Sequence, residues 1–276
     1  MYTLNCKGKL LLLDKPLVMG IINATPDSFY EGHLNKGLDD MVLLAEKMIA
    51  EGADILDIGG QSTKPGSERV AEEEELKRVL PVIKAIHKKI PEVIISVDTF
   101  YSNVANAAVD TGASIINDIS AGSIDDKMIS TVASLKVPYI CMHMKGTPAT
   151  MQHESHYNDV VKEVLDFFIK KVDECKQAGI NDVIVDPGFG FGKNIQHNFK
   201  LLKHLTIFSM LQKPILAGIS RKSTIYKTLG VTANEALNGT TVLNTIALMN
   251  GASILRVHDV REAKEAIRLF EAYQHA

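Results

Sequence analysis

The segment DVIVDPGFGFGK, residues 182–193, joins a short apolar run to a glycine-rich loop. The run Asp182–Asp186 is apolar at its inner positions and ends on a carboxylate. Apolar residues on both faces are typical of a parallel strand that is covered by helices on both sides. The segment therefore predicts a buried strand whose carboxyl end, at Asp186, opens into a loop.

The glycine-rich loop matches neither of the common phosphate-binding patterns. A Walker-type loop would require a glycine at residue 187 and a hydroxyl at residue 194, where this chain has Pro187 and Asn194. The dinucleotide pattern G-x-G-x-x-G also fails, because the third glycine comes one residue early. We therefore expect the glycines to let the backbone turn and approach a flat ligand, with Lys193 on the surface before a helix.

Apolar runs of the same kind recur along the chain, and each is followed by a helical pattern. Eight such alternations without a linker predict a single domain over residues 1–276, a (β/α)8 TIM barrel, with Met1–Lys15 as an N-terminal hairpin at the barrel bottom. A doubly wound open sheet is the alternative. Four acidic residues, Glu72–Glu75, are interpreted as solvated charge at a helix start. The predicted strands are Val18–Asn23, Asp54–Gly59, Val93–Asp98, Ser114–Asp118, Pro138–His143, Asp182–Asp186, Pro214–Gly218 and Ser253–Val257; the helices after residue 100 are Tyr101–Thr111, Asp126–Leu135, Tyr157–Ala178, Gln196–Leu205, Asn234–Asn250 and Arg261–Tyr273.

Composition restricts the class of partner. The net charge of the 276 residues is −3, so no overall basic field indicates nucleic acid or an anionic membrane. Three widely spaced cysteines do not form a disulfide framework and favour a reducing compartment. The apolar run Leu10–Leu13 is too short for a signal peptide or a membrane span. We therefore expect a cytoplasmic protein whose partners are small molecules, with no nucleic acid and no membrane.

Polar side chains follow the predicted strands, at the end of a barrel that carries the active site. Asp98, Asn117 and Asp186 suit a flat heterocycle with an amidine-like edge. A carboxylate that faces two N–H groups makes a bidentate contact, and each charged hydrogen bond contributes roughly 1.5–3 kcal/mol. A single aspartate at a strand end could instead cap a helix. Convergence at one rim is what favours a binding site.

A second set of polar residues suits an anion. Lys222, Arg256 and His258, together with Asn23, lie at the ends of other predicted strands. Arg256 and His258 are two residues apart, so on a strand both would point to the same side. This spacing is consistent with the clamping of one phosphate-like group, and the rim as a whole predicts a site for a heterocycle and a phosphate.

Two metals come into question. Cys141 and His143, followed by His153 and His156, could ligate zinc, but nothing in the spacing fixes the loop of the second pair. A magnesium ion that enters on a diphosphate is favoured, because Mg²⁺ keeps several waters and takes few protein ligands. Mg²⁺ is therefore the expected cofactor.

A specific combination of eight stretches extends over essentially the whole chain. They are MGIINATPDSF (Met19–Phe29), DIGGQSTKPGSERV (Asp57–Val70), SVDTF (Ser96–Phe100), INDISAG (Ile116–Gly122), MHMKGTP (Met142–Pro148), DPGFGFGK (Asp186–Lys193), GISRKS (Gly218–Ser223) and RVHDV (Arg256–Val260). In this order they resemble the dihydropteroate synthases, a family of transferases in folate biosynthesis. The resemblance implies a TIM barrel, often a homodimer, that condenses 6-hydroxymethyl-7,8-dihydropterin diphosphate with 4-aminobenzoate and releases 7,8-dihydropteroate and diphosphate.

The resemblance also implies roles for individual residues. Ionisation of the pterin C–O bond, assisted by Mg²⁺, would precede attack by the amine, and sulfonamides would compete with aminobenzoate. The implied pterin residues are Asp98, Asn117, Met142, Asp186 and Lys222; the aminobenzoate residues are Phe29, Thr63, Pro65, Phe191 and Ser223, with Phe189 packing beneath; the diphosphate residues are Asn23, Thr63, Arg256 and His258, with Asn23 also at the metal; the catalytic set is Asn23, Asp98, Lys222, Arg256 and His258.

The chain departs from the family pattern at Lys64, where members commonly have arginine, and lysine lacks the planar fork. Three alternatives to a synthase remain. A pterin-binding methyltransferase domain would share the Asp and Asn contacts. A Schiff-base aldolase would use Lys222 as its amine. A catalytically silent barrel would have no reason to keep all of these groups together.

Overall fold

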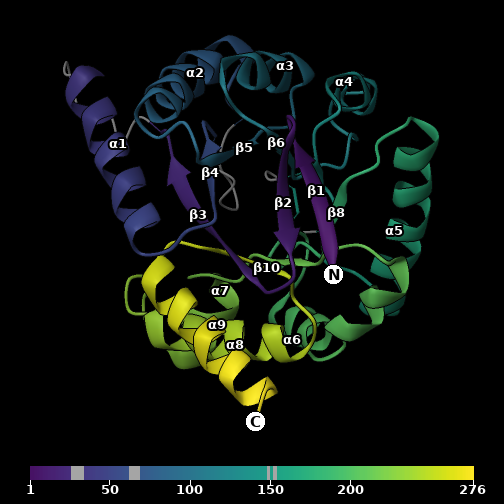
Figure 1. Cartoon of the computed structure of the whole chain (residues 1–276). Helices are drawn as coiled ribbons and strands as arrows, with labels where there is room; N and C mark the ends of the chain where they lie inside the picture. The colour runs from purple at the N-terminus through teal and green to yellow at the C-terminus, as the bar shows by residue number, and fades with distance from the viewer. Residues whose placement is uncertain (26–33, 62–68, 148–149, 152–153) are drawn as a thin grey trace.

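The structure is a computed structural model, and it describes residues 1–25, 34–61, 69–147, 150–151 and 154–276, with side chains from residue 37 onward in the first helix (Figure 1). Its helices form a ring around the strands, and a short hairpin lies over the middle of that ring (Figure 1).

Eight parallel strands of the described residues form one sheet in the order β8-β7-β6-β5-β4-β3-β10-β9. A parallel bridge between Val185 and Ile215 joins the two ends of this order and closes the sheet into a barrel. The strands follow one another around the ring in chain order, which a doubly wound open sheet would not do, so the predicted (β/α)8 barrel is confirmed. Their bounds are β3 Leu17–Asn23, β4 Ile55–Gly59, β5 Ile94–Asp98, β6 Ile115–Asp118, β7 Tyr139–Met142, β8 Val183–Asp186, β9 Leu216–Ala217 and β10 Ile254–Val257.

The helices lie on the outside of the barrel (Figure 1). The expected helices are present, but the short helix α7 and the 3-10 turn after α6 were not predicted, because seven residues give too little periodicity to recognise. No helix in the described ranges has the length and apolar character that a membrane crossing requires. The bounds are α1 Leu34–Ala50, α2 Glu72–Lys89, α3 Ser102–Thr111, α4 Met128–Leu135, α5 Val160–Gln177, α6 Ile195–Lys203, η2 Leu205–Leu211, α7 Ser223–Leu229, α8 Leu237–Met249 and α9 Val260–Gln274.

The N-terminal hairpin closes the bottom of the barrel, as predicted. Its strands β1 (Tyr2–Cys6) and β2 (Lys9–Leu13) pair antiparallel. Leu4, Cys6 and Leu13 belong to the same buried cluster as the side chains that fill the barrel near the start of each strand. That inner layer consists of Leu17, Met19, Ile55, Ile94, Ile115, Ile140, Ile184, Leu216 and Ile254.

The next inner layer toward the carboxyl ends is mostly polar. Successive side chains on a strand point to opposite faces, so the residue two positions after an inner apolar one also faces the barrel interior. Ile55 is followed in this way by Asp57, and Ile184 by Asp186. Ser96, Asn117 and Arg256 have the same position on β5, β6 and β10, whereas β3 and β7 have the apolar Ile21 and Met142 there. Moving two residues along the strands therefore leads from the apolar inner layer to a layer that carries most of the polar side chains of the rim.

One acidic residue at the start of α2 is not solvated. Glu75 is fully buried, and Gln61 Nε2 donates to its Oε2. Burial raises the pKa of this carboxyl group. Glu75 packs beneath Gly60, where an added Cβ would lie 3.0 Å from Glu75 Cγ. The interpretation of Glu72–Glu75 as uniformly solvated charge was wrong at Glu75, because the helix turns its fourth residue toward the barrel.

Candidate active site

Arg256, on the inner face of β10, connects two carboxylates. Its Nε lies 2.6 Å from Asp57 Oδ2, and its Nη2 lies 2.6 Å from Asp98 Oδ2. Only 17% of the Arg256 side chain is exposed. The nearby carboxylates hold the pKa of Arg256 above its ordinary value although burial opposes this. Arg256 is therefore a permanently charged group that organises the acidic side of the rim.

Asp57 was not among the residues predicted from the sequence. It is fully buried on β4, and its Oδ2 also accepts from Asn117 Nδ2 at 3.0 Å. Within the described residues its Oδ1 has no hydrogen-bond partner. The signal that could have identified it is parity: Asp57 shares the inner face of its strand with Ile55 and Gly59. Because its partners Asn117 and Arg256 are 60 and 199 residues away, no local pattern reveals them.

The structure brings Asp98 and Asn117 together. They are Cα partners in the β5–β6 pairing, and Gly59 is the partner of Asp98 on the other side. Burial raises the pKa of Asp98 to about 7, while Arg256 opposes the rise and Asp57 adds to it. Asp98 is thus a carboxyl group that can change its protonation state near neutral pH.

The opposite wall of the site is formed by Asp186 and Lys222. Gly188 N donates to Asp186 Oδ1 at 2.7 Å, and Lys222 Nζ donates to Phe189 O at 2.5 Å. Burial raises the pKa of Asp186, and Lys222 opposes this rise. Burial lowers the pKa of Lys222 to about 8, against the attraction of Asp186. Since Arg256 and Asp98 also act on Lys222, the two walls form one electrostatic cluster.

Apolar side chains line part of the same region. Met142 and Phe191 are buried in one cluster with Phe100, Ile119 and Met151. Lys222 Nζ lies 4.6 Å from the centre of the Phe191 ring, a cation–π distance. Phe189 is also buried, but it belongs to the core between strands and helices. The two rings therefore lie in different clusters, Phe191 beside Met142 and Phe189 in the core.

His258 follows β10 and pairs with a serine that had not been singled out. Its Nδ1 lies 3.0 Å from Ser220 Oγ, and its backbone N–H donates to the same oxygen at 3.2 Å. Although the residue as a whole is exposed, the loss of hydration around the ring, followed by the charge of Arg256, lowers the pKa of His258 to about 4. His258 therefore contributes a neutral ring at the rim.

Of the remaining predicted site residues, two lie within the described ranges. Asn23 ends β3 and is exposed, and Ser223 is the first residue of α7. Phe29, Thr63 and Pro65 lie outside the described residues, as does Lys64.

Lys193 is not a surface residue. It is only 5% exposed, and its Nζ lies 2.9 Å from His143 Nδ1 and donates to the carbonyl oxygens of His143, Gly188 and Phe191 at 3.0–3.1 Å. Burial lowers the pKa of its ammonium group. The prediction failed because the loop folds back over the lysine, which a sequence pattern cannot show. Its loop position before α6 was correct.

Two of the loop glycines approach protein backbone. A Cβ on Gly188 would lie 1.9 Å from His143 O, and one on Gly192 would lie 2.4 Å from Lys145 O. At these two positions the absent side chain admits the loop that follows β7. Gly190 is different, because its Cβ would meet only Lys222 Cδ, at 3.4 Å.

The contacts of His143 bear on the zinc alternative. Its Nδ1 faces the Lys193 ammonium group, and its ring packs edge-on against Phe167 at 4.8 Å. Cys141 is buried in the core between strands and helices, and His153 lies outside the described residues. Across the described ranges no three His, Cys, Asp or Glu side chains are grouped as metal ligands would be.

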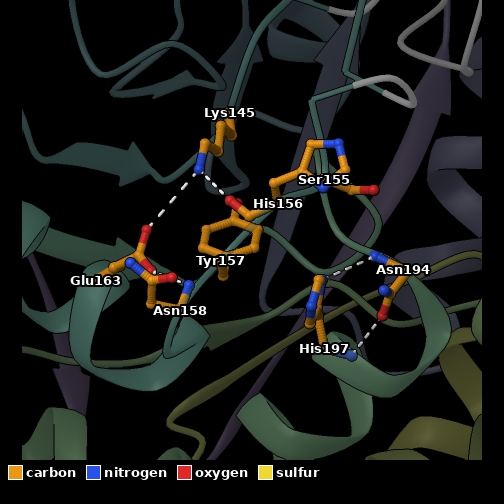
Figure 2. Close-up of a pocket in the computed structure, with 8 residues that line it drawn as sticks. All are labelled: Lys145, Ser155, His156, Tyr157, Asn158, Glu163, Asn194 and His197. Carbon is orange, nitrogen blue, oxygen red and sulfur yellow. Dashed lines mark hydrogen bonds and ion pairs between the residues drawn. The ribbon is translucent and has the colours of Figure 1, made fainter.

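Two pockets lie away from these residues. One, of about 580 Å³, lies near the starts of α5 and α6 and has polar walls (Figure 2). In it Lys145 Nζ lies over the Tyr157 ring at 4.3 Å and 3.8 Å from Glu163 Oε2, while Asn194 and His197 form a capping box (Figure 2). The other, of about 890 Å³, is an apolar groove along α8 and α9. Neither contains a residue of the predicted site.

The fold and rim together define a (β/α)8 barrel enzyme whose polar interior suits a small, planar and charged ligand. The model of the pterin binding enzyme family matches residues 19–258. The dihydropteroate synthase of Escherichia coli (strain K12) is 47% identical over 268 residues, which cover 96% of this chain and 94% of that protein.

Solved structures give the same result. The Yersinia pestis dihydropteroate synthase in complex with a sulfonamide drug has a TM-score of 0.93 and 41% identity, with 100% of both chains covered. The Xanthomonas albilineans dihydropteroate synthase in complex with 7,8-dihydropteroate has a TM-score of 0.89 and 39% identity, again over 100% of both chains. The chain belongs to the dihydropteroate synthases, a family of pterin-binding enzymes.

Proposed function

We propose that this protein condenses 6-hydroxymethyl-7,8-dihydropterin diphosphate with 4-aminobenzoate to give 7,8-dihydropteroate and diphosphate. The observation that carries the proposal is the cluster of Asp57, Asp98, Asn117, Asp186 and Arg256 with Lys222 at the carboxyl ends of the strands. It combines acceptors for a heterocycle edge with cations for a diphosphate. The structure of the Xanthomonas albilineans relative contains 7,8-dihydropteroate, the product that we propose here.

The pterin would lie between Asp98 and Asn117 on one side and Asp186 and Lys222 on the other. Asp186 accepts one bond from Gly188 through Oδ1, which orients its carboxylate toward the barrel interior and toward an amidine-like edge. Asp98 and Asn117 would bind the opposite side of the ring, and Met142 would contact its face. Asp57 would act through Asn117 and Arg256, because both donate to its Oδ2.

The diphosphate would be bound by Arg256 and His258, with Asn23 and Thr63. Neither carboxylate contact of Arg256 uses Nη1, so its guanidinium can serve the anion while it remains anchored. The neutral His258 ring would donate a hydrogen bond to the diphosphate. The negative charge of the bound diphosphate would favour protonation of this ring. Charge that develops on the leaving group is stabilised most when its donors are already in place.

Mg²⁺ fits the residues at this rim. Asn23 provides a hard amide oxygen in an exposed position at the end of β3, which suits an ion that keeps most of its waters and its diphosphate ligands. When bound, Mg²⁺ would supply electrostatic stabilisation of the departing diphosphate. We propose Asn23 as its protein ligand.

The reaction requires no strong base. As the C–O bond of the pterin methylene breaks, its electron pair leaves with the diphosphate, and the cation that remains is delocalised into the ring. The lone pair of the neutral aromatic amine forms the new C–N bond, and the amine proton is then released. Asp98 and Asp186 would favour the positive ring, which explains why the site has carboxylates.

The aminobenzoate would lie beside Phe191, the Lys222 stem and Ser223. The distance of 4.6 Å between Lys222 Nζ and the centre of the Phe191 ring supports this subsite. We propose Thr63, Pro65 and Phe29 for the same subsite from their motif positions.

A coupled assay tests the proposed function. The purified protein should release diphosphate from the pterin diphosphate only when aminobenzoate is present, and chelation of Mg²⁺ should abolish the release. A sulfonamide should raise the KM for aminobenzoate without changing the KM for the pterin. Absence of diphosphate release would refute the synthase function. A Lys222 adduct trapped by borohydride with a carbonyl substrate would favour an aldolase instead.

We also propose that residues 1–276 form one domain that assembles as a cytoplasmic homodimer. The hairpin shares the barrel's inner cluster, and α9 packs against β3 and β10.

The groove on α8 and α9 has exposed apolar residues, which a second copy would cover. All three cysteines are buried and unpaired, as a reducing compartment favours. Light scattering should give twice the 30.2 kDa mass of one chain. The exposed apolar residues of the groove are Met249, Leu269 and Tyr273, and Val242 and Ile246 are further exposed apolar residues of α8.

A further inference from the structure

Lys193 is a buried cation whose contacts in the described residues are oxygen and nitrogen acceptors of two loops. Its Nζ donates to Gly188 O and Phe191 O, both at 3.0 Å, in the loop after β8. It also donates to His143 O at 3.1 Å and lies 2.9 Å from His143 Nδ1, at the start of the loop after β7. Burial, followed by the charge of Lys193, lowers the pKa of His143, which favours the neutral ring. A single ammonium group therefore ties the two loops together.

The two loops meet backbone to backbone. The space beside Gly188 and Gly192 is filled by the carbonyl oxygens of His143 and Lys145. A close approach of this kind buries carbonyl groups where no strand or helix supplies their donors, and buried carbonyls are almost always paired. Lys193 donates to one of these two carbonyls, that of His143, and to the loop carbonyls of Gly188 and Phe191, from a position that solvent barely reaches.

The peptide that Lys193 holds is the one that orients Asp186. Gly188 donates its N–H to Asp186 Oδ1 at 2.7 Å and its carbonyl accepts from Lys193. Phe191 is held by the same cation through its carbonyl, and its N–H donates to Gly188 O at 3.1 Å. On the other side of the loop, Lys222 holds Phe189 O. The positions of the Asp186 carboxylate and the Phe191 ring thus depend on a loop that is fixed from both sides.

We propose that Lys193 is a positioning residue for the condensation: by holding the carbonyls of Gly188 and Phe191 it sets the Asp186 carboxylate and the Phe191 ring, and it touches neither substrate. This inference rests on the proposed function, in which Asp186 binds the pterin and Phe191 contacts the aminobenzoate. The diphosphate groups Arg256 and His258 have no contact with Lys193, so their part of the site should not depend on it.

The test compares Lys193→Met, which removes the ammonium group and keeps an unbranched stem, with the matched control Tyr139→Phe. Tyr139 is fully buried on β7 and donates to Asp118 Oδ2 at 2.7 Å, so its variant also loses a buried hydrogen bond but leaves the loops unchanged. Calorimetry measures the Kd of 6-hydroxymethylpterin and of inorganic diphosphate with Mg²⁺. Thermal unfolding and steady-state kinetics complete the comparison.

In Lys193→Met the Kd for the pterin should rise at least roughly tenfold, which corresponds to about one weakened charged hydrogen bond. The KM for aminobenzoate should rise as well, while the Kd for diphosphate stays within about twofold. Tyr139→Phe should lower the Tm and leave all of these constants unchanged. Lys193→Gln, which keeps an N–H donor, should fall between the wild type and Lys193→Met, and it takes the place of Lys193→Met if that variant does not fold.

The inference is overturned if the pterin Kd of the Lys193 variants follows their Tm in the way that Tyr139→Phe does, or if diphosphate binding weakens as much as pterin binding. Either result would make Lys193 a purely structural residue. Failure of the proposed function is recognised separately, because the wild-type protein in the same series would then release no diphosphate.

Discussion

Asp57 should be essential for turnover although it lies beneath the predicted binding surface. In Asp57→Asn the Oδ2 charge that serves Arg256 Nε at 2.6 Å and Asn117 Nδ2 at 3.0 Å is lost. The amide oxygen can still accept both bonds, but each is weaker once the negative charge has gone. Hydrogen bonds to a charged group contribute roughly 1.5–3 kcal/mol each.

The loss of about 3 kcal/mol from these two contacts should lower kcat/KM by roughly 10²-fold, since each 1.36 kcal/mol corresponds to a tenfold change. The assay is diphosphate release at limiting pterin diphosphate. A matched control is Asp54→Asn, because Asp54 Oδ2 also makes two contacts, with Val18 N at 2.8 Å and Lys264 Nζ at 2.9 Å, before β4 begins.

Asp54→Asn should keep kcat/KM within about threefold of wild type. Asp57→Asn should also shift the Asp98 ionisation to lower pH, because the Asp57 charge raises the pKa of Asp98. If Asp57→Asn retained kcat/KM within about threefold, or if both variants lost activity equally, the idea that Asp57 orients the rim would be refuted.

The remaining predictions concern pH, the loop and the pterin edge. For kcat/KM we expect a bell-shaped pH profile that rises through pH 7 or so as Asp98 ionises and falls above about 8 as Lys222 loses its proton. In Asp98→Asn the residual activity should no longer decrease on the acid side. A profile that is flat from roughly pH 6 to 9 would contradict both assignments. Burial lowers the pKa of Lys222 in the folded state to about 8. The free energy of unfolding should therefore rise as the pH increases from this value to the pKa of lysine in the unfolded chain, which urea titrations at a series of pH values can measure. Gly188→Ala, with φ of 69° and a Cβ 1.9 Å from His143 O, should cost roughly 2–5 kcal/mol of unfolding free energy, whereas Gly179→Ala, with φ of 89° and open space, should cost only about 1–2 kcal/mol. Asp186→Asn should weaken calorimetric pterin binding by at least roughly tenfold, since an amide cannot accept from both N–H groups, and an unchanged affinity would exclude this role.

Much of the fold could be predicted because barrel strands leave a strong local signal. Strands such as β5 (Ile94–Asp98) and β8 (Val183–Asp186) are buried on both faces and appear as continuous apolar runs. The order of the runs, with a helix after each, leaves few topologies. The short α7 escaped prediction because its seven residues span only about two turns.

The candidate site could be predicted where its chemistry follows strand ends. Asp98, Asn117, Asp186 and Arg256 could be predicted to lie at one rim, because barrel strands bring their carboxyl ends together there; their roles stay predictions. What pairs with what could not be predicted. Arg256 lies between two carboxylates, and at a sequence separation of 199 from Asp57 no local pattern relates the two side chains.

Two charged residues show where local interpretation ends. Glu75 and Lys193 both follow the usual rules for exposed charge, one in the first turn of a helix and one before a helix start. Both are buried, because folding supplies their partners: Gln61 for Glu75, and for Lys193 both His143 and the carbonyls of its own folded-back loop.

The sequence by itself determined the barrel, the rim and the kinds of polar group that the rim presents, because strand period and strand ends are local properties. Only the tertiary structure decided which charges are paired, which lysine is buried and which glycines face protein backbone. The physical reason is that burial and charge pairing depend on the distance between segments far apart in the chain, and closure of the barrel is what brings those segments together.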